Sequence, residues 1–261
     1  MSTSSASTSN DAPHVDSSAH GGGDPGPTTG TSDWQQYARF RGRIIHREQL
    51  AKDTHVFTLE RPDGFRFSPG QGVNLTIDRK EHRTQKHPMF LTGLPHERRL
   101  EIFVHGNEAE DSQNRTMIED CPVGTRLLFT AAEDFVHYQS PGVFIAAGAG
   151  IAAFASIFRH LNATEQIDGH RLFLVNERRE DVVLQSEWFR YFGHSVTSTL
   201  TEEEHRDFEH GTVDRDWLQN RVNDFNQSFY VCGPPRMTER LQQTIEDLGG
   251  EVQTVPWPGS K

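Results

Sequence analysis

Cysteine is scarce in this sequence: Cys121 and Cys232 are the only two in 261 residues. Two thiols more than a hundred residues apart cannot supply a disulfide framework, an all-cysteine zinc site or an iron–sulfur cluster held by four thiolates. The 14 histidines include no His-Glu-x-x-His pattern and no tight His/Cys set, so no metal site is predicted. This cysteine usage is typical of a reducing compartment, and we expect a cytoplasmic protein.

Long apolar runs and an excess of positive charge are also missing. No stretch approaches the roughly 18–20 apolar residues of a membrane span. The N-terminus has neither the basic region nor the apolar region of a signal peptide. The formal charge is −11, from 26 Lys+Arg and 37 Asp+Glu, whereas a protein that grips nucleic acid usually shows a basic excess at least locally. The sequence therefore predicts neither a membrane span nor a nucleic-acid partner.

The first 33 residues have a composition of their own. They contain 8 Ser, 5 Thr, 5 Gly, 3 Pro and four Asp, with no Lys, Arg or Glu. Such a segment buries too little apolar surface to offset the entropy of ordering it. We predict that residues 1–33 form a disordered acidic tail, with a docking arm or spacer as the alternative interpretation.

Residues 34–138 have the pattern of a small β domain. Turn sequences such as Pro62-Asp63-Gly64 and Pro69-Gly70 separate short apolar or alternating segments. One helix is predicted from Ser112 to before Pro122. Several short strands with a single helix are typical of a small barrel or sandwich. The predicted strands are 39–47, 54–60, 73–77, 91–92 and 100–105.

Residues 139–261 alternate between strands and helices. A buried strand at 142–147 is followed by Gly148-Ala149-Gly150 and by a helix at 151–161 with its apolar residues on one face. The alternation predicts a parallel α/β sheet with right-handed crossovers. Further strands are predicted at 171–175, 194–200, 228–231 and 251–255, and further helices at 185–192, 214–222 and 235–248.

Two turns in this second half indicate ligand chemistry. In the Gly148-Ala149-Gly150 turn, backbone N–H groups can approach a pyrophosphate while the helix N-terminus contributes its positive dipole. Such a turn is also common where a strand and a helix simply pack closely. The second turn is Cys232-Gly233-Pro234, which ends the predicted strand at 228–231 at the carboxyl edge of the sheet, where open α/β sheets bind ligands. A buried cysteine at a proline-terminated strand is the simpler interpretation of that turn.

Together these segments resemble the ferredoxin–NADP reductase superfamily, in its flavodoxin-reductase or flavin-reductase type. The matching motifs occur in the family's order and spacing over roughly residues 36–255. They are Phe67-Ser68-Pro69-Gly70-Gln71 leading into 73–77, then 86–95, 142–151, 176–184, 211–214 and the Cys-Gly-Pro turn.

The resemblance implies a six-stranded antiparallel flavin-binding barrel at 34–138, followed by a parallel-sheet α/β NAD(P)-binding domain at 139–261. In this family a hydride passes from NADPH or NADH to FAD, and the protein supplies orientation and electrostatics. With no cysteine cluster in the chain, the electrons are expected to leave to a separate acceptor: a ferredoxin, a flavodoxin or a small molecule. By position, Gly148, Ala149, Gly150 and Ile151 face the pyrophosphate, Cys232 and Gly233 lie beside the nicotinamide, and Pro234 shapes the turn. The candidate catalytic residues are Cys232 and Phe90.

The family's flavin signature, Arg-x-Tyr/Phe-Ser/Thr, is altered here to His87-Pro88-Met89-Phe90. His87 is largely neutral near pH 7 at its ordinary pKa and cannot supply the permanent bidentate charge of arginine. Met89 can contact a ring through sulfur but cannot stack as an aromatic does, and Phe90 has no hydroxyl. These changes predict weaker flavin binding.

Three further positions stay open. In the stretch that opens the lone predicted helix, Arg115 and the adjacent Thr116 fall where the family places a hydroxyl, so Arg115 is either a phosphate contact or an ordinary surface residue. Arg178 lies where the adenosine ribose is expected; an arginine there reads a 2′-phosphate, whereas the neighbouring Glu177 reads a 2′-hydroxyl.

The sequence as a whole is compatible with an FAD-dependent NAD(P)H oxidoreductase, or with a flavin-weakened NAD(P)H-binding protein that regulates or docks to a partner.

Overall fold

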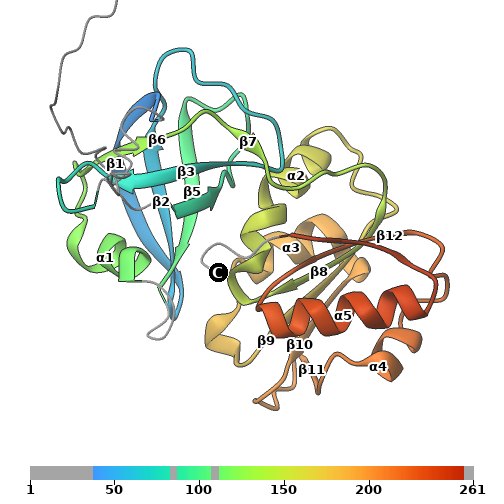
Figure 1. Ribbon diagram of the computed structural model, residues 1–261. Helices are drawn as coiled ribbons and strands as arrows, with labels where there is room; N and C mark the ends of the chain where they lie inside the picture. The colour runs from blue at the N-terminus through green and yellow to red at the C-terminus, as the bar shows by residue number, and fades with distance from the viewer. Residues whose placement is uncertain (1–37, 83–86, 107–111, 256–261) are drawn as a thin grey trace, which may run out of the picture. The chain divides into compact units, whose positions relative to one another are not determined.

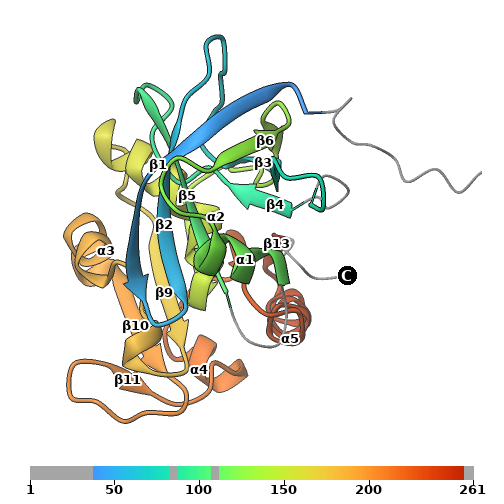
Figure 2. The same cartoon turned by 90° about the vertical axis from the view of Figure 1, so that its left-hand side faces the viewer.

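A computed structural model describes residues 38–82, 87–106 and 112–255 of the chain. The acidic segment predicted at 1–33 lies outside the described residues. Figures 1 and 2 show the antiparallel strands of the first half in blue to green, and the parallel strands and helices of the second half in yellow to red. Within the described ranges no helix is long and apolar enough to cross a membrane.

The first half forms an antiparallel barrel. Its strands follow the order β4-β3-β6-β1-β2-β5, and β7 pairs with β3 outside this path. The Thr92 amide, just after β4, donates to the Glu101 carbonyl in β5 at 2.9 Å and so links the two ends of the path. The predicted six-stranded barrel is therefore confirmed. Its elements are β1 (Phe40–Ala51), β2 (Thr54–Glu60), β3 (Gln71–Ile77), β4 (His87–Phe90), β5 (Arg99–His105), α1 (Ser112–Asp120), β6 (Arg126–Phe129) and β7 (Glu133–Asp134).

The strand predicted at 91–92 is wrong: β4 ends at Phe90, and residues 91–92 follow it. The misplacement has a physical cause, because Pro88 reads as a strand breaker but is tolerated in β4, an end strand that pairs only with β3. The predictions also omitted β6, and they ended β1 at residue 47. In the structure β1 continues to Ala51 through two register shifts in its pairing with β2.

The second half is a parallel sheet, as predicted, with six strands in the order β11-β10-β9-β8-β12-β13. The predictions omitted the short strand β11. The predicted third strand begins at Val196 rather than at residue 194, because Gly193–Ser195 form a 3-10 turn that opens with Gly193 at φ +55°. The elements are β8 (Gly142–Ala147), α2 (Ala152–Ala163), β9 (Arg171–Asn176), α3 (Gln185–Phe192), β10 (Val196–Leu200), β11 (Glu209–His210), α4 (Arg215–Gln219), β12 (Ser228–Cys232), α5 (Pro235–Asp247) and β13 (Glu251–Thr254).

Alternate residues of the parallel strands face opposite layers of helices. In β8, Phe144 and Ala146 pack with α2 and α3, whereas Val143 and Ile145 pack with α4 and α5. The first layer continues into the barrel, because its buried cluster also contains barrel residues. We call it the α2 cluster; its members used below are Phe90, Phe103 and Val136 from the barrel and Ile151, Phe154, Phe158 and Cys232 from the α/β half.

A buried polar contact also joins the barrel to α2. Gly70, in the turn before β3, has φ +84°, a conformation that favours glycine, and its amide donates to Ser156 Oγ at 3.0 Å. The Ser156 side chain is buried at 1 % exposure, so this amide has no access to water through that side. The contact therefore fixes the position of α2 relative to the turn that precedes β3.

Replacing Ser156 by alanine is expected to lower the free energy of unfolding by about 1–3 kcal/mol, because a buried donor loses its acceptor. Denaturant unfolding measures the change. Ser140→Ala is the matched control, since the Ser140 hydroxyl meets the Ser228 hydroxyl at 3.0 Å in a half-buried place. The control is expected to change the unfolding free energy by less than about 0.5 kcal/mol. Equal losses in the two variants would contradict the prediction.

Candidate functional site

The strand order indicates a candidate ligand site at the carboxyl ends of β8 and β12. The chain leaves β8 towards β9 and β10 on one side, and later returns to add β12 and β13 on the other. In open α/β sheets, ligands bind where the order reverses in this way. The segment Gly148–Ile151 follows β8 directly, and residues 232–234 close β12. The two turns singled out in the sequence are therefore adjacent.

The turn after β8 has the geometry of a phosphate cradle at its first two residues. Gly148 adopts φ +51° with open space where a Cβ would stand, and Gly148 and Ala149 are both half-buried. Within residues 38–82, 87–106 and 112–255, no side chain caps the 3-10 turn Gly148–Ile151 or the helix α2 that continues it. Uncapped amides and the helix dipole together favour an anion at this point.

Gly150 and Gly233 lie at the switch point, the place where the strand order reverses between β8 and β12, and they allow close packing. A Cβ on Gly150 would lie 2.5 Å from the Cys232 carbonyl oxygen, and one on Gly233 would lie 2.7 Å from the Ala147 Cβ. Both residues are buried, as is Ile151. Gly150 and Gly233 thus bring the turns after β8 and β12 into contact, while Gly148 and Ala149 stay accessible.

Cys232 ends β12 with its side chain fully buried in the α2 cluster. Burial raises the pKa of its thiol far above the ordinary value, so the sulfur is a neutral, compact group rather than a thiolate nucleophile. Pro234, two residues on, is exposed and precedes α5, which begins with Pro235.

The altered flavin signature divides between two surroundings. His87 and Pro88 are half-buried at the start of β4, whereas Met89 points into the barrel core at 2 % exposure. Phe90 joins the α2 cluster and meets Phe135 edge to face, with ring centroids 5.6 Å apart. Phe90 therefore belongs to the same buried cluster as Ile151 and Cys232, whereas Met89 belongs to the cluster inside the barrel.

Arg115 and Thr116 lie on α1, away from that cluster. The Arg115 Nε lies 2.8 Å from a Glu119 carboxylate oxygen one turn along the helix, and both side chains are about half exposed. Thr116 is half-buried. Among the described residues, the α2 cluster contains none from α1.

Arg178 lies in a hollow of about 590 Å³ beyond the carboxyl end of β9. Its guanidinium is 3.4 Å from a Glu202 carboxylate oxygen, and the Arg179 amide donates to Glu203 at 2.8 Å. The hollow is lined by Arg178, Arg179, Glu180 and Glu203, so it carries both signs of charge. Glu177, the acidic residue that the sequence sets against Arg178, is not among the residues that line the hollow.

Sequence analysis missed an ion-pair network around Arg159, on α2. Its guanidinium donates to Glu101 Oε1 at 2.5 Å and to both carboxylate oxygens of Glu187, and its side chain is 15 % exposed. Burial alone would lower the pKa of Arg159, but the hydrogen bonds and charges of Glu187 and Glu101 outweigh it and raise the pKa. Nothing in the spacing of these three residues marks them, because they come from β5, α2 and α3.

Comparisons with known proteins agree with the fold of both halves. Residues 144–243 match the family model described as Oxidoreductase NAD-binding domain. A flavohemoprotein of Bacillus cereus is 27% identical over 241 residues, which cover 83% of this chain and 60% of that protein. The solved FAD/NAD-binding domain of nitric oxide dioxygenase from Vibrio cholerae is similar, with a TM-score of 0.71 and 16% identity; the match covers 84% of this chain and 98% of that one. A ferredoxin–NADP⁺ reductase from Neisseria gonorrhoeae, solved with bound FAD and NADP, has a TM-score of 0.72 and 18% identity; the match covers 82% of this chain and 97% of that one.

Residues 144–243 therefore match an oxidoreductase NAD-binding domain, and the chain has the two-domain fold of the FAD/NAD-binding domain and the ferredoxin–NADP⁺ reductase to which it is similar. This confirms the resemblance drawn from the sequence motifs. The chain spans about 60% of the length of the flavohemoproteins it matches.

Proposed function

We propose that this chain is an FAD-dependent NAD(P)H oxidoreductase that passes a hydride from NAD(P)H to the flavin and electrons on to a separate acceptor. One observation carries the proposal: Phe90 of the barrel signature strand lies in the same buried cluster as Ile151 and Cys232, at the switch point of an oxidoreductase NAD-binding domain. Hydride transfer needs two cofactors held in contact, and this cluster is where the two halves of the fold meet.

The chain's own residues have distinct tasks in this proposal. The amides of Gly148 and Ala149 bind the pyrophosphate of the nucleotide, since that turn is open and its helix is uncapped. Gly150 and Gly233 hold the two turns together, and the neutral Cys232 thiol lines the nicotinamide end. Pro234 fixes the direction of the chain into α5.

The barrel fits FAD by position more than by side-chain chemistry. FAD supplies the two-electron chemistry when it is bound. His87 and Pro88 are half-buried at the start of β4, where they can meet the flavin phosphates, and Phe90 borders the nicotinamide end. Arg115 and Thr116 on α1 are the remaining candidate phosphate contacts. Because position 87 has no permanent charge and position 90 no hydroxyl, we expect FAD to bind more weakly than it does to an arginine–aromatic–hydroxyl signature.

The choice of nucleotide and acceptor rests on fewer residues. Arg178 favours NADPH, whereas the acidic groups Glu202 and Glu203 beside it favour NADH. The acceptor is a separate ferredoxin, flavodoxin, haem protein or small molecule. Cys121 and Cys232 are both buried and unpaired, which supports a cytoplasmic setting.

An absorbance experiment tests the proposal. The purified protein is titrated with FAD, and NADPH or NADH is then added without oxygen. We expect a flavin spectrum that bleaches on addition of nucleotide, with the faster nucleotide identifying the donor. The control is free FAD with the same nucleotide. A protein that binds FAD but is not bleached by either nucleotide contradicts the proposal.

A second candidate function is an NAD(P)H-binding protein without flavin, which regulates or docks to a partner. The observation that favours it is Phe90, whose ring is 4 % exposed and already packed edge-on to Phe135 beside the nicotinamide end. The same titration separates the two functions: nucleotide binding by calorimetry without any flavin spectrum would support this second candidate.

A further inference from the structure

Arg159 contacts three separate elements of the fold from the middle of α2. Its Nη1 donates to the Thr92 carbonyl at 3.0 Å and to Glu101 Oε1 at 2.5 Å, both in the barrel half. On its other side, Nε and Nη2 donate to the two Glu187 carboxylate oxygens of α3, at 2.7 and 3.1 Å. The guanidinium also lies 5.8 Å from the centre of the Phe103 ring. One side chain thus joins β5, α2, α3 and the segment after β4.

Thr92, two residues beyond Phe90, is held by every polar group it has. Its amide donates to the Glu101 carbonyl at 2.9 Å, its hydroxyl donates to Glu101 Oε1 at 2.8 Å, and its carbonyl accepts from Arg159. The residue is fully buried. On the β3 side, the Leu91 amide donates to the Gln71 carbonyl at 3.1 Å. Since β4 pairs with no strand of the described residues on its other side, the bonds of Thr92 hold its C-terminal end there.

The same face of α2 is anchored to the barrel a second time. Ser156 lies three residues before Arg159, so the two side chains share one face of the helix, and Ser156 accepts the Gly70 amide. The helix that these residues anchor is the one that begins at the open Gly148 turn. The contacts therefore relate the end of β4 to the start of the nucleotide-binding helix.

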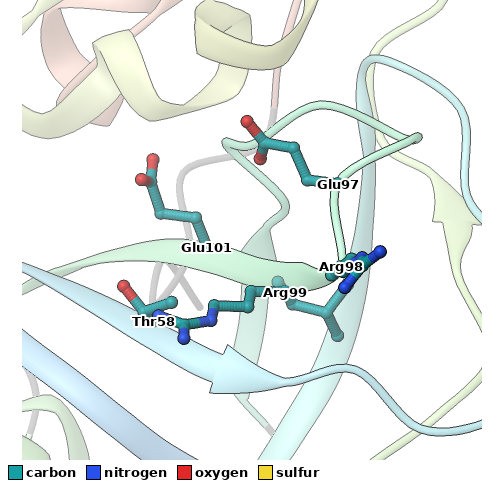
Figure 3. Close-up of a pocket in the computed structure, with 6 residues that line it drawn as sticks. Thr58, Glu97, Arg98, Arg99 and Glu101 are labelled. Atoms are coloured by element: carbon teal, nitrogen blue, oxygen red, sulfur yellow. The ribbon is translucent and has the colours of Figure 1, made fainter.

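The Glu101 carboxylate pairs with Arg159, although two other arginines lie much nearer to it in sequence. Glu101 helps to line a hollow of about 290 Å³ together with Thr58, Glu97, Arg98, Arg99 and Leu100. Figure 3 shows the Glu101 carboxylate well apart from the guanidinium groups of Arg98 and Arg99. The Arg159 and Glu101 side chains are 15 % and 26 % exposed. Another arrangement of these two groups would therefore leave a partly desolvated charge without its partner.

We propose that Arg159 is a positioning residue, which through Thr92 and Glu101 holds Phe90 at the end of β4 against the nicotinamide end of the site at Ile151 and Cys232. The inference rests on the proposed hydride transfer for its functional consequence, but its structural part stands without any cofactor. In this inference, the network of Arg159 aligns the two halves of the fold and does not itself bind the nucleotide.

Arg159→Lys tests this inference, since lysine keeps the charge but cannot reach Thr92, Glu101 and Glu187 together. Without cofactors, we expect the Thr92 amide to exchange hydrogen about tenfold faster than in the wild-type chain. With FAD and saturating nucleotide, we expect flavin reduction to slow about tenfold or more, while the Kd of the nucleotide changes by less than about twofold.

Arg221→Lys is the matched control. Arg221 also pairs with a carboxylate (Glu209), donates to a backbone carbonyl and lies over an aromatic ring (Trp217), but wholly within the α/β half. The Arg221→Lys variant should leave the hydrogen exchange of the Thr92 amide and the rate of flavin reduction unchanged. Should Arg159→Lys fail to fold, Thr92→Val removes one bond of the same network and is expected to give the same changes to a smaller degree.

The outcomes separate the inference from the proposed function. Unchanged Thr92 exchange in Arg159→Lys, or equal changes in Arg221→Lys, would overturn the inference. Faster exchange with an unaltered rate of flavin reduction would also overturn it, because the network would then be structural only. Faster exchange in a protein whose wild-type form is never reduced by nucleotide would leave the positioning of β4 supported and the proposed function refuted.

Discussion

Gly150→Ala is expected to lower the affinity for NAD(P)H at least about tenfold and the free energy of unfolding by about 1–3 kcal/mol. The new Cβ would stand 2.5 Å from the Cys232 carbonyl oxygen and 2.8 Å from its carbonyl carbon. Both are backbone atoms, so neither can rotate away. The turn after β8 must then separate from the turn after β12, and the two halves of the nucleotide site part. Titration with NADPH and NADH, and denaturant unfolding, measure the two effects.

Substitutions at two other glycines distinguish the effect of a steric clash from the effect of backbone strain. Gly148 at φ +51° and Gly249 at φ +88° both have open space at the Cβ position, so alanine there adds strain of roughly 1–2 kcal/mol without a clash. Gly148→Ala is expected to weaken nucleotide binding as well, because the strain falls on the open turn. Gly249→Ala, after α5, should affect stability only. Nucleotide binding that survives in both Gly150→Ala and Gly148→Ala would place the nucleotide elsewhere.

The parts of the fold that could be predicted from the sequence are those set by local chemistry. The strand β2 has the predicted bounds because apolar and polar residues alternate between turn sequences. The strand–glycine–helix unit at β8 and α2 was recognisable because the positive φ at position 148 favours glycine, which is visible in the sequence. Strand β4 was misplaced because its proline is acceptable only in an end strand, and strand order is not a local property.

The candidate site was predictable only where one segment carries it. The Gly148 and Cys232 turns follow strands of one parallel sheet, so the sequence pattern brings them to one edge. The side to which Met89 points depends on the register of β4 against β3, and the sequence predicted no strand there. The Arg159 network joins residues 28 and 58 positions away along the chain, and long-range partners of this kind leave no periodic signal.

Restoring the family's flavin signature at two positions is expected to change stability and flavin affinity in opposite directions. In His87→Arg with Phe90→Ser, the arginine adds a charged donor for the flavin phosphates and the serine adds a hydroxyl at the end of β4. Hydrogen bonds to charged groups contribute about 1.5–3 kcal/mol, so we expect FAD affinity to rise at least about tenfold. Without FAD, the loss of the buried Phe90 ring should cost about 3–5 kcal/mol of unfolding free energy, because a cavity opens against Phe135.

His87→Arg with Phe90→Ala isolates the hydroxyl, since it makes nearly the same cavity and keeps the same charge. The difference in FAD affinity between the two double variants measures what a hydroxyl at position 90 contributes. Because a ligand that binds only the folded chain stabilises it more when it binds more tightly, FAD should raise the Tm of the serine variant more than that of the wild-type chain. If the serine variant is destabilised as expected but binds FAD no better than the wild-type chain, then flavin does not bind at the end of β4. The barrel would then serve the nucleotide domain as a scaffold, with Phe90 filling the place that a flavin ring would occupy.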